Sequence, residues 1–123
     1  MRLWPGLHFS MNGRDRTRLR HMLDAANEAI SFAVGKNSGD LYRDRLLALA
    51  LAKEIEIIGE AAIKISIECR TALAEVPWST VIGIRNRLIH EYFDVDLNIV
   101  WSTTTCDLPD LVRELEKALS RPE

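Results

Sequence analysis

The residues best suited to chemistry lie in one short stretch, 85–92, whose sequence is RNRLIHEY. His90 is a candidate general base, because histidine titrates near neutral pH and can take the proton from a ribose 2′-hydroxyl. Arg85 is a candidate for stabilising the charge that grows on phosphorane oxygens, through paired hydrogen bonds. Asn86 could orient His90 or hold a phosphate oxygen. These residue types suit RNA cleavage without a metal ion.

Helical spacing decides how these side chains stand relative to one another. On an ideal helix Arg85 and His90 are about 140° apart, whereas Asn86 and His90 are one turn apart and face each other. Arg85 and His90 therefore do not converge on one small site unless the helix ends near His90 or a second chain brings its own copies. A two-fold dimer would place two arginines and two histidines around one groove.

Arg85 also lies beside the apolar face of its helix, where an unpaired cation is costly. Glu60 on the preceding helix is the candidate partner, and Arg87 on a neighbouring strip is a candidate supporting residue. A purely structural interpretation stays open from spacing alone. An arginine and a histidine near a helix end are common, and a histidine there interacts well with the helix dipole.

The elements that must position these residues are predicted to be helices, because apolar residues recur at helical spacing along the chain. The expected helices cover residues 14–34, 40–71, 79–91 and 96–119. Asp40 and Asp96 are the expected N-caps, and Pro109 should kink the last helix. No alternating run is long enough for a strand, so the predicted fold class is all-α, a compact bundle of four to five helices.

The second of these helices is apolar on more than one side, which predicts contact with another chain in addition to the core. Gly59 and Ala62 would allow helices to approach closely at that contact. Residues 14–120 are expected to form a single domain, and residues 1–13, which lack periodicity, a loose N-terminal extension. Four arginines at alternate positions of 14–20 circle the first helix, so they indicate either a solvated helix start or an RNA-binding surface.

Composition limits the function classes. The chain has 123 residues, 47% of them hydrophobic, and a net charge of -2, so any contact with RNA must be local. Cys69 and Cys106 are far apart and are expected to be buried thiols in a reducing cytosol. The chain lacks a signal peptide pattern, and charges interrupt its most apolar stretch, which rules against a membrane span. We therefore expect a cytoplasmic protein, with no metal site and no cofactor.

The stretch around His90 resembles the motif of HepT-type toxins within the HEPN superfamily: an arginine, four residues, a histidine, one residue and a tyrosine, here Tyr92. An arginine and a histidine at this spacing are a weak indication, but the tyrosine and the flanking blocks make the resemblance specific. The flanking blocks are IIGEAA at 57–62, VPW at 76–78, YFDVD at 92–96, IVW at 99–101 and DLP at 107–109. The similarity covers about Arg14 to Leu119.

The resemblance implies a homodimeric HEPN fold whose RNase groove lies at the dimer interface, with Arg85, Asn86 and His90 as the site of an endoribonuclease toxin of a type VII toxin–antitoxin system. It also implies a partner, a nucleotidyltransferase antitoxin of the MntA type that uses ATP to attach AMP to Tyr92. The expected substrate is RNA. HEPN-like helical proteins also occur as non-catalytic binding subunits of nucleotidyltransferases, and this alternative stays open.

Overall fold

The computed structural model of the chain describes residues 10–90 and 96–121, and every regular element in these ranges is helical. The four longest helices are α2 (Gly13–Ala33), α4 (Arg45–Lys64), α6 (Trp78–His90) and α8 (Leu108–Leu119). Shorter segments join them: α3 (Asp40–Arg43), α5 (Ile67–Ala72), α7 (Leu97–Ser102) and the π-helical turn η1 (Thr103–Asp107). The prediction of an all-α bundle is confirmed.

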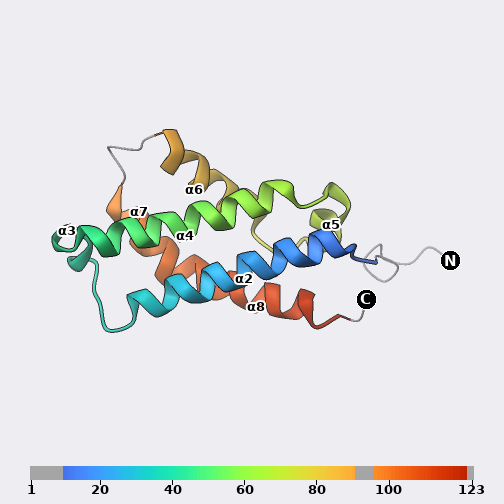
Figure 1. Cartoon of the computed structure of the whole chain (residues 1–123), viewed down its shortest axis with the longest axis horizontal. Coiled ribbons are helices and arrows are strands. Elements are labelled where there is room, and N and C mark those ends of the chain that lie inside the picture. Colours follow the sequence, from blue (N-terminus) through green and yellow to red (C-terminus); the bar gives the residue numbers. More distant parts are fainter. Residues whose placement is uncertain (1–9, 91–95, 122–123) are drawn as a thin grey trace.

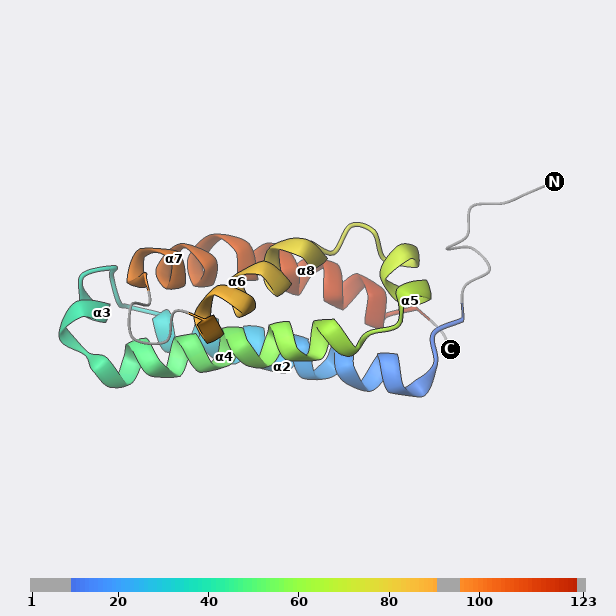
Figure 2. The same cartoon turned by 90° about the horizontal axis from the view of Figure 1, so that it is seen from above.

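The helices form two layers around one core (Figure 2). In one layer α2 and α4 run antiparallel, and their contact is the most extensive in the structure (Figure 1). In the other layer α6 packs on α4, and α8 packs on α2. The large side chains that are fully buried come from both layers and include Leu19, Met22, Leu51, Ile58, Leu111 and Leu115. Within the described ranges no helix combines the length and the hydropathy that crossing a membrane would need.

The prediction of one continuous helix over 40–71 is wrong, because this stretch is divided into α3, α4 and α5. Asp44 has an extended backbone, with φ -120° and ψ 91°, and its carboxylate caps α4, whereas Asp40 lies inside α3. Ser66 caps α5 and also donates its hydroxyl to the buried carboxylate of Asp15 in α2, at 2.6 Å. Periodicity missed both breaks because the apolar pattern continues across them.

Two arginines of α2 hold the ends of other helices. Arg18 Nη1 donates to the carbonyl oxygen of Lys64, the last residue of α4, at 2.7 Å. Arg16 donates to the carbonyl oxygens of Leu119 and Arg121 at the end of α8, at 3.1 and 2.9 Å. Carbonyls at a helix C-terminus have no partner within the helix, and cations there are favourable. These two arginines therefore stabilise the ends of other helices. Their alternate spacing in the sequence did not indicate this role.

The last predicted helix is interrupted by η1, a π-helical turn that ends two residues before Pro109. The proline lies in the first turn of α8, where its missing N–H costs little. Asp96 caps α7, as predicted, by accepting hydrogen bonds from two backbone N–H groups. Cys106 in η1 is exposed, so the expectation of two buried thiols is correct for Cys69 and wrong for Cys106.

A carboxyl pair lies in the seam between α2 and α4. Glu54 of α4 is buried, with 6% of its surface exposed, and its carboxyl hydrogen-bonds to that of Glu28 of α2. Burial, together with the hydrogen bond and the charge of Glu28, raises the pKa of Glu54 to about 7. At neutral pH this carboxyl is therefore protonated in a large fraction of molecules, which allows two acidic groups to lie side by side in the seam.

Candidate functional site

Arg85 is positioned by a close approach between two helices. Gly59 of α4 lies directly under the side-chain stem of Arg85 in α6. A Cβ atom placed on Gly59 would lie 2.2 Å from Cβ and 2.6 Å from Cγ of Arg85, and 3.1 Å from the carbonyl oxygen of Val81. Only a residue without a side chain leaves room for this contact. The expectation that Gly59 would serve contact with another chain is therefore wrong, because the glycine is needed to seat Arg85 within the same chain.

The guanidinium of Arg85 is held by an acidic and an amide side chain. Its Nη2 donates to Glu60 Oε2 at 2.5 Å, and its Nη1 donates to Asn86 Oδ1 at 2.9 Å. Glu60 Oε1 also lies 3.9 Å from Lys64 Nζ. The side chain of Arg85 is 22% exposed, and its buried Nε has no hydrogen-bond partner among the described residues. The ion pair between Arg85 and Glu60 that the sequence suggested is therefore present.

Asn86 and His90, predicted to face each other across one turn, take different positions. The side-chain oxygen Oδ1 of Asn86 accepts a hydrogen bond from Arg85, so this side chain is turned toward the guanidinium. His90 is exposed and is the last residue of α6, and Arg87 is also exposed. Arg85 faces the seam with α4 while His90 is exposed at the helix end, and among the described residues no hydrogen bond joins their side chains. Tyr92, the predicted modification site, lies outside the described residues.

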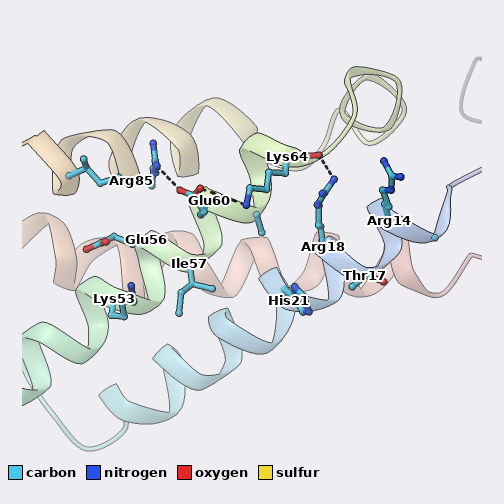
Figure 3. Close-up of a pocket in the computed structure, with 13 residues that line it drawn as sticks. Arg14, Thr17, Arg18, His21, Lys53, Glu56, Ile57, Glu60, Lys64 and Arg85 are labelled. Atoms are coloured by element: carbon cyan, nitrogen blue, oxygen red, sulfur yellow. Dashed lines mark hydrogen bonds and ion pairs between the residues drawn. The ribbon is translucent and has the colours of Figure 1, made fainter.

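Arg85 lines an open groove of about 760 Å³ between α2, α4 and α6 (Figure 3). The basic side chains of the lining are Arg14, Arg18, Lys53, Lys64 and Arg85, and its acidic side chains are Glu56 and Glu60. In the close-up, Arg14 and Arg18 extend from α2 in the same direction, and Arg18 reaches the end of α4. Sequence reasoning missed this groove, because nothing in the spacing indicated that the start of α2 lies beside the end of α4.

Comparison with protein families identifies the chain. The family model described as "Ribonuclease HepT-like" matches residues 22–118. The chain belongs to the HepT-like ribonuclease family. The matched region contains α4 and α6, and therefore Gly59, Glu60, Arg85 and His90. The resemblance proposed from the motif and its flanking blocks is confirmed, and with it the class of RNA nuclease.

Individual relatives agree with this assignment. "Putative RNase TTE0752" of Caldanaerobacter subterraneus subsp. tengcongensis is 34% identical over 106 residues, which cover 86% of this chain and 95% of that protein. "Putative RNase MJ1380" of Methanocaldococcus jannaschii is 33% identical, over 86% of this chain and 98% of that protein. "Probable ribonuclease HepT" of Thermococcus cleftensis is 36% identical over 63% of this HepT-like chain and 71% of its own length. No solved structure matches the chain significantly.

The contact between Gly59 and Arg85 gives a direct test of how the site is positioned. Replacing Gly59 with alanine should push α6 away from α4 and lower the free energy of unfolding by about 2 kcal/mol or more, since neither a backbone carbonyl nor a side-chain stem can move aside cheaply. Urea unfolding followed by circular dichroism measures this change.

Gly83 provides the matched control within α6. A Cβ atom placed on Gly83 meets nothing within 4 Å, so Gly83→Ala should raise the free energy of unfolding by about 0.5–1 kcal/mol through helix propensity. If Gly59→Ala were as stable as Gly83→Ala, the close approach of α4 and α6 would not be what places Arg85.

Proposed function

We propose that this HepT-like protein is an endoribonuclease toxin that cleaves RNA without a metal ion, at a site built from Arg85 of one chain and His90 of a second chain. The observation that carries this proposal is the division of the motif. Arg85 is fixed against α4 by Gly59 and Glu60, whereas His90 is exposed at the end of α6. A two-fold dimer would bring a second arginine and a second histidine to the same groove, so each site could take its histidine from the partner chain.

The proposed reaction uses the 2′-hydroxyl of the RNA as the nucleophile. His90 removes the proton of this hydroxyl, the 2′-oxygen bonds to the adjacent phosphorus, and the bond from phosphorus to the 5′-oxygen breaks. The imidazolium returns the proton to the leaving 5′-oxygen, which leaves a 2′,3′-cyclic phosphate and a 5′-hydroxyl. Arg85 stabilises the extra negative charge on the phosphorane oxygens, and Asn86 keeps the guanidinium oriented.

Exposed apolar side chains in the first turns of α4 support a second chain there. Leu46 and Leu49 are 79% and 48% exposed. Figure 2 shows that α6 ends part-way along α4 and does not extend over the first turns of α4. Burying these side chains would stabilise a dimer by roughly 25 cal/mol per Å². We place the two-fold axis at this surface.

We further propose that the toxin is neutralised at Tyr92 by an MntA-type nucleotidyltransferase, as the family resemblance implies. Tyr92 is two residues from His90, so an AMP group on its hydroxyl would bring bulk and negative charge to the mouth of the site. RNA phosphates would then be repelled as well as blocked. Under this proposal the type VII antitoxin inhibits the toxin by adding negative charge where RNA enters the site.

The cleavage proposal predicts that purified protein degrades single-stranded RNA in the presence of EDTA, and that His90→Ala lowers the rate by at least about 100-fold. Product ends identified by mass spectrometry should carry a 2′,3′-cyclic phosphate. The control is His8→Ala, which removes a histidine outside the motif. Full activity of His90→Ala, or the same loss in His8→Ala, would contradict the assignment, and wild-type protein that binds but never cleaves RNA would favour the non-catalytic binding subunit.

The neutralisation proposal predicts that co-expression with a cognate MntA-type enzyme adds the mass of one or more AMP groups to the chain. Tyr92→Phe should lose this added mass while retaining the cleavage activity of the unmodified protein. Tyr42→Phe is the control, because Tyr42 is exposed and lies far from the motif in sequence. AMP found on the Tyr92→Phe protein would show that the acceptor is a different residue.

A further inference from the structure

The groove between α2, α4 and α6 concentrates positive charge in an acidic protein. Its lining holds five basic side chains and two acidic ones, a formal excess of three positive charges, whereas the whole chain has a net charge of -2. The remainder of the chain is therefore distinctly acidic. Because nucleic-acid affinity depends on local rather than overall charge, this groove is where the described surface can attract phosphates.

Several of these cations are not neutralised by the protein. Arg14 and Lys53 form no ion pair with any described residue, and Arg18 donates to an uncharged carbonyl oxygen. Arg85 and Lys64 share a single carboxylate, that of Glu60. The start of α2, at Gly13, also opens onto the groove, and a helix N-terminus adds positive potential. The groove thus combines free positive charge from two helices with the cation of the proposed catalytic site.

The floor of the groove is apolar. Ile57 and Ala61 of α4 and Ile89 of α6 line it. Figure 3 shows Ile57 between Lys53 of α4 and Arg18 of α2. From Lys53 to Lys64 the groove follows α4 for about 17 Å, which is enough for a few nucleotides of extended strand. Sites for single strands typically combine a positive groove for the backbone with an apolar or aromatic surface for unstacked bases.

We propose that this groove binds the single-stranded RNA that flanks the bond to be cleaved, with Arg14 and Lys53 contacting its phosphates on opposite sides and Arg85 receiving the phosphate that reacts. This inference rests on the proposed function and names its substrate class. A second copy that covered the whole groove would bring like charges together, so the partner chain contributes only its His90 beside Arg85. The apolar surface at the start of α4 suits a second chain better.

The test is RNA binding to a chain that carries His90→Ala, so that binding is measured without cleavage. A fluorescein-labelled RNA of about 12 nucleotides without secondary structure is titrated by anisotropy from about 50 to about 200 mM salt. Adding Arg14→Gln and Lys53→Gln should weaken binding about tenfold at the lower salt concentration. The slope of log Kd against log salt should fall by about 1.4, because each phosphate contact on a single strand contributes about 0.7.

The matched control is the pair Arg20→Gln and Lys36→Gln, which removes the same charge from exposed positions outside the groove. It should leave the salt slope unchanged. Equal losses in the two pairs, or no binding of the RNA by the His90→Ala chain, would overturn the proposal. An unlabelled duplex that competes as well as the single strand would overturn the choice of substrate form.

Sedimentation velocity tests whether a second chain, rather than RNA, occupies the groove. If Arg14→Gln with Lys53→Gln changes the oligomeric state rather than RNA affinity, the groove is a contact between chains and the proposal is wrong. The binding result does not depend on catalysis, because it is measured on chains that carry His90→Ala. Loss of binding in the groove variant, together with a wild-type chain that does not cleave, would refute the nuclease and keep the RNA site. If the wild-type chain cleaves RNA but the groove variant still binds RNA normally, the nuclease is kept and the RNA site is refuted.

Discussion

The structure depends on one contact, the seating of Arg85 of α6 on Gly59 of α4. The missing side chain at Gly59 lets the arginine stem lie against the helix, and the next residue of α4, Glu60, supplies the carboxylate that holds the guanidinium. A partly buried cation would otherwise be costly. Two adjacent residues of α4 therefore solve both the steric and the electrostatic problem of placing an arginine at a helix seam.

Fixing Arg85 in this way has a consequence for His90. Because α6 is short and the arginine is committed to the seam, the histidine is carried to the helix end and into solvent. The structure thus separates a partly buried, hydrogen-bonded arginine from an exposed histidine. Apolar side chains at the start of α4 remain exposed, and in the groove beside the arginine Arg14 and Lys53 form no ion pair with any described residue. In our account a second chain covers the former and RNA neutralises the latter.

Much of this arrangement could be predicted from the sequence. Helical periodicity predicted the all-α fold. Helix geometry predicted that Arg85 needs an anionic partner, for which Glu60 was a candidate, and that Arg85 and His90 do not converge on a straight helix. The breaks at Asp44 and Ser66 were not predicted, because each depends on a local side-chain cap inside an unbroken apolar pattern. The groove was not predicted either, since it exists only because α2 and α4 are antiparallel and bring Arg14 and Lys64 to the same end. Patterns along the sequence predict the helices and some side-chain pairs. Which charged side chains share a surface depends on how helices far apart in the sequence pack together.

The central claim is that each site takes its arginine and its histidine from different chains, and mixed dimers test it most directly. One chain carries Arg85→Gln, the other carries His90→Ala, and two affinity tags allow the mixed dimer to be purified. Each parent dimer should be inactive, whereas the mixed dimer should recover about half of the wild-type activity, because one of its two sites keeps both groups. A mixed dimer as inactive as its parents would show that both groups act within one chain.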